Sequence, residues 1–585
     1  MASMFVQPQV VANAAANVAD IGSMVGAANA AAAGPTTGVV AAASDEVSAA
    51  TATLFNTYAQ DCQELLKRAA VLHQQFGQAL AAAGKAYVES ETAAQALLGG
   101  STAAGGVTGA ADPPLPQTLI APSVGLFMGG SGNPIPNATY VNGVLNWVNQ
   151  NFAVTMSNAL PLFTPEGLYP VTGIKNLPVN MSVSQGVTIL QSAINQQLFP
   201  TSGTAAPSVA VLGYSQSAVI SSLVMQNLAS GNYPFQVPST SQLGFTLLGD
   251  PMNPNGGLLE RFVGLTLPSL GFDFYGATPP NTPYNTAIYT LEYDGFADFP
   301  QYPIDVLSDL NAVLGIQYVH GTYASINPNA LPPGDTMIEL PGSATLPGGT
   351  GATNYYMVTQ PNLPLLDPVR AIPVIGNPIA DLVQPDLSVL VNLGYGSTTQ
   401  GWSTGPANVP TPFGVIPPVS PGSVISALAA GTPQGIGAFA NDVSAGIAGV
   451  PSLSNVSLPD LSSMGTGGGF SFLPAAPTSA PAAIDGFIQA LQTANSTIVN
   501  GISGSAANAY AVLLPTADIA NALAISLPSY DVNLFLNGVQ QVLNGDPAGG
   551  LVYAFGAPVA ADVGLGTLAA GFELDVLLDA AGFDL

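Results

Sequence analysis

The chain has 585 residues, of which 48% are hydrophobic and 7% are charged, enough for several domains and at least one large core. Six basic side chains against 33 acidic ones give a formal net charge of −27, which argues against binding to nucleic acid through a basic patch. One cysteine, Cys62, excludes an intrachain disulfide framework, and two histidines, His73 and His320, leave little for a zinc site. We therefore expect chemistry that needs no metal or other cofactor, directed at a neutral or apolar ligand.

Residues 1–98 are rich in Ala and poor in Gly, with one break at Gly34-Pro35-Thr36-Thr37 that predicts two helices joined as a hairpin. The second arm carries apolar side chains at spacings of three and four, from Val47 to Phe76, so one stripe of that helix needs a partner. A linker rich in Gly, Thr and Pro follows at 99–116. The first residues lack the pattern of a secretory signal, and no uninterrupted apolar run has the length of a membrane span, so Sec export and membrane insertion are both disfavoured.

Residues 117–400 alternate short apolar β-like runs with helix-like segments, which predicts an α/β fold with a mostly parallel sheet. The expected strands are Ser123–Met128, Ser208–Leu212, Gly244–Leu248 and Ala287–Tyr293, and the expected helices are Tyr140–Phe152, Ser182–Leu198, Gln216–Leu228 and Ile304–Leu314. Residues 401–585 shift to Gly, Pro, Ser, Ala and Asn. We expect this low-complexity region to be a loosely structured tail without chemistry of its own.

The most informative stretch is Gly213-Tyr214-Ser215-Gln216-Ser217, which lies between a predicted strand and a predicted helix. A sharp turn there with small flanking residues would expose one serine hydroxyl above the sheet edge, as in the nucleophile elbow of α/β hydrolases. Two other windows fit the same loose pattern, around Ser403 and Ser503. Ser403 precedes a Pro-rich run and Ser503 follows a helix-like segment, so context favours Ser215 as the nucleophile.

A serine nucleophile needs an imidazole base that is oriented by a carboxylate. His320 is the only histidine in the α/β region, while His73 lies in the hairpin and is most simply a surface or partner-facing residue. Asp294 and Asp298 both follow a predicted strand and both satisfy the chain order of nucleophile, acid and base. We favour Asp298, keep Asp294 as a close second and rank Asp250 third.

An oxyanion hole needs two backbone N–H groups directed at the developing charge. The sequence offers Gln216, directly after the nucleophile, and Ser131 in the glycine-rich loop that follows the first strand. The segment Pro251–Pro283 is rich in Leu, Phe, Pro and Gly, and we expect it to form a lid or the wall of an acyl-chain site.

Residues 1–98 resemble the PE domain of mycobacteria, through Ala28–Ala33, Asp45–Ala50 and His73-Gln74-Gln75-Phe76. The resemblance implies a PPE-family partner for the hairpin. It also implies type VII secretion to the cell wall or surface, since Tyr87 and Glu91 match that pathway's Tyr-x-x-x-Asp/Glu signal.

The region from about 120 to 400 is similar to the PE-PPE domain, an α/β serine hydrolase related to cutinases. The matching segments are Gly129–Pro134, Gly213–Ser217, Tyr293–Pro300, Tyr318–Tyr323 and Leu365–Pro373. The chain has Ser217 where cutinases carry Gly, and it lacks their disulfides. The resemblance implies a carboxylesterase acting on acyl esters.

The leading hypothesis is therefore an exported or cell-wall-associated serine esterase or lipase that cleaves neutral acyl esters. Its catalytic residues would be Ser215, His320 and Asp298, with the amides of Ser131 and Gln216 as the oxyanion hole. One alternative is an acyltransferase that passes the acyl group to a sugar or lipid hydroxyl. Another is a surface interaction protein whose hydrolase fold is no longer used.

Overall fold

The structure is a computed structural model that describes residues 124–201, 205–347, 349–373, 375–449 and 512–581, and single residues between 30 and 60. The chain divides into two compact units, residues 1–116 and 117–585. The predicted hairpin at 1–98, apart from those single residues, and the linker at 99–116 lie outside the described residues.

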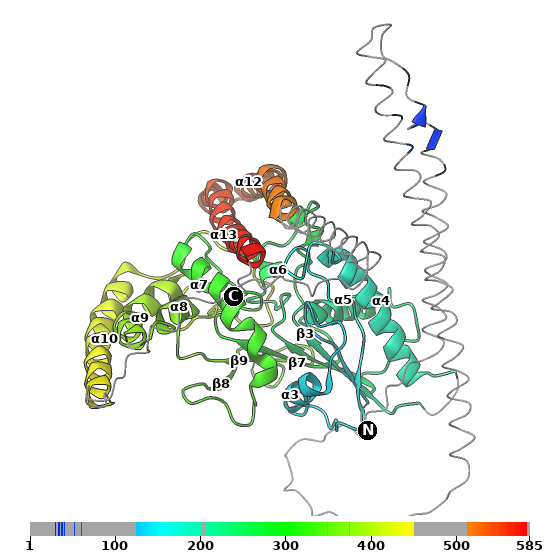
Figure 1. The fold of residues 1–585 in the computed structure, drawn as a ribbon, viewed down its shortest axis with the longest axis horizontal. Coiled ribbons are helices and arrows are strands. Elements are labelled where there is room, and N and C mark those ends of the chain that lie inside the picture. The colour runs from blue at the N-terminus through cyan, green and yellow to red at the C-terminus, as the bar shows by residue number, and fades with distance from the viewer. Residues whose placement is uncertain are drawn as a thin grey trace, which may run out of the picture. The chain divides into compact units, whose positions relative to one another are not determined.

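A seven-stranded sheet forms the centre of the second unit (Figure 1), with the strands in the order β2-β1-β3-β4-β7-β9-β8. Neighbouring strands are parallel, except that β8 runs antiparallel to β9. The predicted α/β fold with a mostly parallel sheet is thereby confirmed. The strands are β1 (Val124–Phe127), β2 (Ala159–Pro161), β3 (Val209–Tyr214), β4 (Leu243–Leu248), β7 (Asn285–Leu291), β8 (Met337–Glu339) and β9 (Thr353–Val358).

Helices follow the strands and bury the sheet. They are α3 (Ala138–Val148), α4 (Val179–Leu198), α5 (Gln216–Ser230), α6 (Leu258–Arg261), α7 (Val306–Tyr318), α8 (Asp367–Arg370) and α9 (Gly376–Leu393), with short 3₁₀ turns at His320–Ser325 and Pro364–Leu366. A two-stranded hairpin, β5 (Thr266–Leu267) and β6 (Phe272–Asp273), stands apart from the sheet. Every strand and helix predicted in this region is present, with ends that differ by a few residues.

The central strands are apolar throughout because both faces of the sheet are covered. Successive side chains of a strand point to opposite faces, so neighbours in β3 enter different cores. Val211 packs in one buried cluster with Leu190 and Ile220 of helices α4 and α5. Leu212 packs in a second cluster with Trp147 of α3. The strand therefore holds its carboxyl end, where Ser215 follows, between two cores.

The region beyond residue 401 is not the loosely structured tail predicted from composition, as far as the structure describes it. Residues 421–449 form helix α10 (Pro421–Gly449), and residues 512–581 include α12 (Leu527–Leu543) and α13 (Pro547–Ala581). A π-helical turn, Ala522–Ser526, leads into α12. Two stretches, Val512–Leu543 and Pro547–Leu578, have the length and composition of membrane spans, contrary to our expectation, with 22% and 39% of their most apolar windows buried in the protein.

Arg261 at the end of α6 ties the chain beyond residue 400 to the α/β core. Its guanidinium is fully buried and donates to the carbonyl of Phe299, to the hydroxyl of Ser403 and to the carbonyl of Thr411. Burial lowers the pKa of Arg261 to about 10, so the group is still charged at neutral pH. Ser403, one of the rival nucleophile windows, is thus a buried structural partner of this arginine.

Helix α7 packs directly against the backbone of the loop that carries Asp294. A Cβ on Gly315 would collide with the carbonyl oxygen of Tyr293, and one on Gly295 would collide with the carbonyl oxygen of Ala312. Such close contact of two backbones leaves no room for a side chain. Because α7 ends just before His320, this packing sets the position of the imidazole relative to the loop.

We predict that Gly315→Ala destabilises the protein by roughly 1–3 kcal/mol, since the added methyl forces the helix away from the loop. Chemical denaturation monitored by circular dichroism measures the change. Gly321→Ala is the matched control, because a Cβ at Gly321 meets nothing within 4 Å. Equal stability of the two variants would contradict this account of the packing.

Candidate active site

Ser215 lies at the turn between β3 and α5 with strained backbone angles, φ 57° and ψ −119°. A positive φ is unfavourable for a residue with a Cβ and persists only where the surroundings enforce it. Gly213 permits the sharp turn, because a Cβ there would lie within 2.6 Å of the Ser217 carbonyl oxygen. The strand–turn–helix context predicted for Ser215 is present.

Ser217, which replaces the glycine of cutinases, stabilises the turn. The backbone N–H of Tyr214 donates to its hydroxyl at 2.8 Å, and that hydroxyl donates to the Tyr214 carbonyl at 3.1 Å. The Ser217 side chain is fully buried, and these two hydrogen bonds connect the end of β3 to the first turn of α5. The departure from the cutinase pattern is therefore compatible with the same backbone geometry.

His320 lies at the start of the 3₁₀ turn after α7, with its Nε2 atom 2.7 Å from the Ser215 hydroxyl oxygen. The Tyr214 ring stacks on the imidazole at 5.5 Å between centroids, and the Tyr214 hydroxyl donates to the His320 carbonyl. Phe296 meets the imidazole edge-on at 4.8 Å. These contacts hold the ring with one nitrogen directed at the serine.

Asp294, and not Asp298, lies against the histidine. His320 Nδ1 is 2.8 Å from Asp294 Oδ1 and 2.9 Å from Oδ2. Tyr323 donates to Oδ2 at 2.8 Å, and the Phe296 N–H donates to Oδ1 at 3.0 Å. The carboxylate is completely buried and accepts hydrogen bonds from several donors, which fix its orientation toward the imidazole.

The preference for Asp298 as the partner of His320 is therefore wrong. Its Oδ2 accepts from the Tyr293 N–H at 3.0 Å, while its Oδ1 is buried with no hydrogen-bond partner. Burial raises the pKa of Asp298 well above its usual value. Asp298 caps the turn that presents Asp294, and Tyr293 within that turn has a positive φ of 65°.

Asp250, the third choice, also has a structural position. Its carboxylate accepts from the Met252 N–H at 3.0 Å and from the Thr278 hydroxyl at 2.6 Å, and it is fully buried. Burial raises the pKa of Asp250 to about 6. These bonds close the turn after β4 onto the segment at residue 278.

The glycine-rich loop after β1 lies beside Ser215. A Cβ on Gly130 would come within 3.1 Å of the Ser215 Cβ, so only glycine lets the loop backbone approach this closely. Gln216 is the first residue of α5, where a backbone N–H lacks an intrahelical acceptor. The structure thus brings the loop that carries Ser131 next to Ser215, which Gln216 directly follows.

The Gln216 side chain joins three segments around this point. Its Nε2 donates to the Ser131 hydroxyl at 3.1 Å and to the Gly167 carbonyl at 2.7 Å, and its Oε1 accepts from Ser182 at 2.6 Å. The Ser182 hydroxyl in turn accepts from the Gly167 N–H at 2.8 Å. This network fixes the loop beside Ser215, and the sequence analysis did not identify the part that Gly167 and Ser182 play in it.

Glu166 holds the same loop through a backbone hydrogen bond. Its backbone carbonyl accepts from the Gly132 N–H at 2.8 Å, and one carboxyl oxygen accepts from the Thr164 hydroxyl. The other carboxyl oxygen is buried without a hydrogen-bond partner. Burial raises the pKa of Glu166 to about 8, so the group is neutral at neutral pH.

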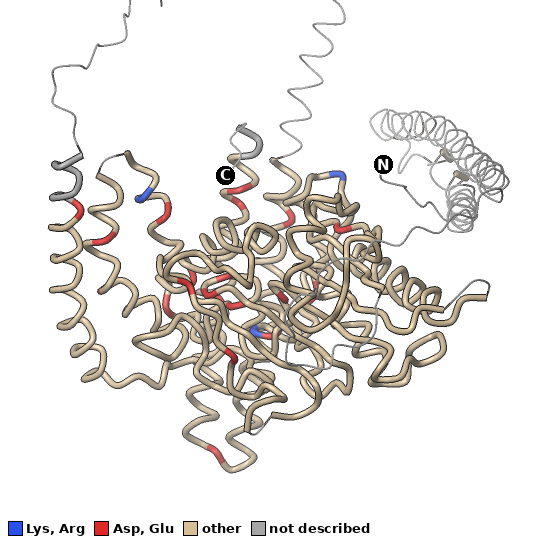
Figure 2. Tube along the Cα trace, turned by 90° about the horizontal axis from the view of Figure 1, so that it is seen from below, with Lys and Arg blue, Asp and Glu red and all other residues tan. Residues whose placement is uncertain are grey.

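The surroundings offer little positive charge for an anionic ligand. Figure 2 shows basic residues at very few positions of the described chain, and the sequence has none after Arg370. Arg370 pairs with Asp381 at 2.6 Å, and Arg261 is buried. Among the described residues, no group of three or more His, Cys, Asp or Glu side chains is placed to hold a metal ion.

Two protein-family models match this chain. The PE family matches residues 4–94, and the PE-PPE domain matches residues 156–396, which include Ser215, Asp294 and His320. The PE family protein PE3 of Mycobacterium tuberculosis is 45% identical over 443 residues, 74% of this chain and 87% of PE3. The chain belongs to the PE family. It carries a PE-PPE domain, as its sequence motifs predict.

Two further relatives come from the same organism. Esterase PE16 is 41% identical over 419 residues, covering 71% of this chain and 73% of PE16. The uncharacterized PPE family protein PPE28 is 48% identical over 467 residues, which is 79% of this chain but only 66% of PPE28. The predicted secretion residues Tyr87 and Glu91, and the rival serine Ser503, lie outside the described residues.

We predict that Glu166→Gln removes part of the pH dependence of stability. The pKa of Glu166 is raised from 4.5 to about 8. The resulting contribution to the free energy of unfolding is therefore fully present below pH 4.5 and is lost as the pH rises through 8. The free energy of unfolding of the wild type should therefore fall relative to the variant between pH 4.5 and 9. Parallel pH curves from chemical denaturation would show that Glu166 is not buried as described.

Proposed function

We propose that this protein is a serine carboxylesterase or lipase that hydrolyses neutral acyl esters through an acyl-enzyme on Ser215. The PE-PPE domain and the 41% identity with an esterase support an esterase- or lipase-like function. The observation that carries the finer proposal is the continuous hydrogen-bonded chain from Ser215 through His320 to Asp294. Nucleophile, base and orienting carboxylate are all within direct contact.

In the first half of the reaction, the Ser215 oxygen attacks the ester carbonyl carbon while His320 Nε2 takes the hydroxyl proton. The imidazolium that forms is stabilised by Asp294, whose carboxylate accepts a hydrogen bond from Nδ1–H. The carbonyl oxygen becomes an oxyanion, and the N–H groups of Gln216 and Ser131 are the proposed donors to it. Collapse of this intermediate breaks the ester C–O bond, and His320 returns the proton to the leaving alcohol.

In the second half, water takes the place of the alcohol. His320 removes one proton from the water as its oxygen attacks the acyl carbon, and the resulting intermediate expels the Ser215 oxygen, which recovers its proton. The products are a carboxylic acid and the regenerated enzyme. The net charge of −27 and the scarcity of available cations favour an uncharged ester as substrate.

We predict that Ser215→Ala abolishes hydrolysis of p-nitrophenyl esters, measured by release of p-nitrophenolate. Asp294→Asn should lower kcat by about 10⁴-fold, since the amide no longer holds His320 in the required tautomer. Asp298→Asn should leave kcat within about ten-fold, because its carboxyl, with a raised pKa, is well mimicked by the neutral amide.

The two aspartate variants serve as each other's controls, since both side chains are completely buried and leave the same loop. Circular dichroism establishes that each is folded. Turnover that survives Ser215→Ala would overturn the acyl-enzyme proposal, and loss of activity in the Asp298 variant alone would restore Asp298 as the catalytic acid.

A further inference from the structure

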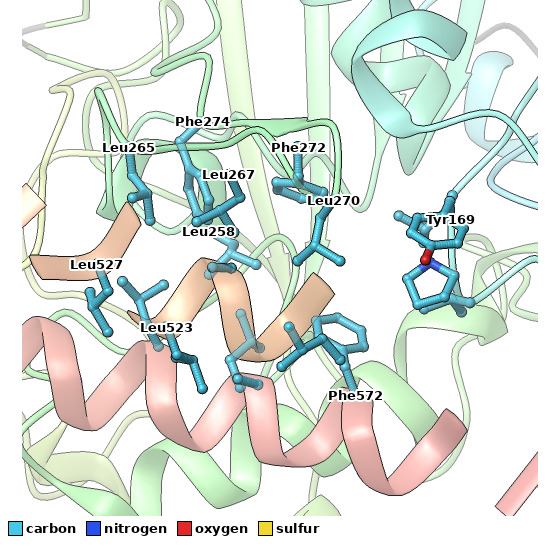
Figure 3. Close-up of a pocket in the computed structure, with 18 residues that line it drawn as sticks. Tyr169, Leu258, Leu265, Leu267, Leu270, Phe272, Phe274, Leu523, Leu527 and Phe572 are labelled. Atoms are coloured by element: carbon cyan, nitrogen blue, oxygen red, sulfur yellow. The ribbon is translucent and has the colours of Figure 1, made fainter. Parts of the chain in front are cut away.

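A cavity of about 90 Å³ lies between the β5–β6 hairpin and the C-terminal helices, residues 512–581, which we term the cap. All its lining side chains are apolar or aromatic. Figure 3 shows Leu265, Leu267 and Phe272 of the hairpin on one side, with Leu523 and Leu527 of the cap on the other. The segment 251–283, which we expected to form a lid or an acyl-chain wall, lines one side of the cavity, and the other side comes from the region expected to be a tail without chemistry of its own.

One edge of the cavity is linked through a single neighbouring residue to Gln216, a proposed oxyanion donor. One edge is formed by Leu168 and Tyr169. Leu168 directly follows Gly167, whose carbonyl accepts from the side chain of Gln216 at 2.7 Å. The cavity wall is thereby continuous with the segment that fixes the residue after the nucleophile.

A second connection leads to the histidine side. Phe572 of α13 lines the cavity, and its ring centroid lies 6.4 Å from that of Phe296. Phe296 contacts the His320 ring at 4.8 Å. Cavity-lining residues are thus one contact away from the groups that hold Gln216 and His320, and this proximity places the cavity within reach of one substituent of an ester bound at Ser215.

The cap is attached to the hydrolase by specific contacts. The Tyr169 hydroxyl donates to the Asp518 carboxylate at 2.6 Å, and the Ser269 hydroxyl donates to the Asp518 carbonyl at 2.8 Å. A Cβ on Gly571 of α13 would lie within 2.6 Å of the Val313 side chain in α7, so this helix packs closely on the hydrolase. The π-helical turn at Ala522–Ser526 places a local irregularity at the cavity wall, where Ala522 and Leu523 lie.

We propose that this cavity binds the acyl chain of the substrate, and that the cap completes the acyl-binding site of the enzyme. The inference rests on the proposed esterase function and extends it to a substrate class. One water needs about 10–15 Å³ on the same volume measure, so the cavity has space for roughly six to nine methylene-sized groups. The substrate class is therefore a neutral ester of a medium-length acyl chain.

Ala569 and Ala570 of α13 provide a matched pair of variants. Ala569 lines the cavity, whereas Ala570 is exposed on the next position of the same helix. Ala569→Leu should lower kcat/KM for p-nitrophenyl octanoate by about ten-fold or more and leave p-nitrophenyl acetate within two-fold, because the added carbons fill the chain's space. Ala570→Leu should change neither. An unchanged ratio of octanoate to acetate turnover in Ala569→Leu would overturn the proposal.

Leu267→Ala tests the same site from the opposite wall and covers the case in which Ala569→Leu does not fold. Enlarging the cavity should move the preferred acyl chain to greater length by at least one two-carbon step. An unchanged preference in this folded variant would also contradict the proposal.

A binding measurement separates this inference from the catalytic proposal. Equilibrium dialysis of radiolabelled 1-octanol, whose chain fits the space derived above, against the full-length Ser215→Ala protein needs no turnover. Binding that weakens about ten-fold or more with Ala569→Leu, and not with Ala570→Leu, supports the cavity even if no ester is hydrolysed. Equal binding by both variants would contradict it even if the esterase proposal holds.

Discussion

The strained turn at Ser215 is the constraint on which the rest of the site depends. A serine with φ of 57° is held there because strand β3 is fixed between two cores and helix α5 begins immediately after it. Gly213 and Ser217 make the turn sterically possible and close it with hydrogen bonds. Every other part of the site is arranged relative to this hydroxyl: the loop at Gly130 beside it, and His320 on the end of α7.

Two sets of contacts position the other residues of the site relative to Ser215. Gly295 and Gly315 bring α7 onto the loop of Asp294, which sets the separation of imidazole and carboxylate. The Gln216 side chain binds the loop of Ser131 to the segment at Gly167. Leu168, which follows Gly167, lines the apolar cavity. The proposed catalytic residues and the proposed acyl site are therefore held by one connected set of segments.

The sequence was sufficient for four of the seven strands of the sheet and for the placement of Ser215 and His320, because each depends on local pattern, whereas the short or edge strands β2, β8 and β9 were not predicted. A buried strand followed by small residues and a helix is legible at Ser215, and His320 had no competitor in the same region. The choice between Asp294 and Asp298 depends instead on the conformation of one turn. Tyr293 with positive φ and the hydrogen bond from the Asp298 N–H to the Asp294 carbonyl decide which carboxylate faces the histidine, and chain order does not contain that information.

Composition led to a wrong prediction for the C-terminal region, where the abundance of Gly, Pro and Ala indicated little regular structure. Tertiary packing overrides those propensities, since glycines such as Gly564 and Gly571 allow α13 to approach the hydrolase closely.

The most direct test of the central claim is covalent labelling with a fluorophosphonate, which reacts only with a serine activated as a nucleophile, followed by peptide mapping by mass spectrometry. The account predicts one adduct per chain, located on Ser215, and no adduct when His320 is changed to Ala. An adduct on another serine, or an unlabelled Ser215 in folded protein, would contradict it.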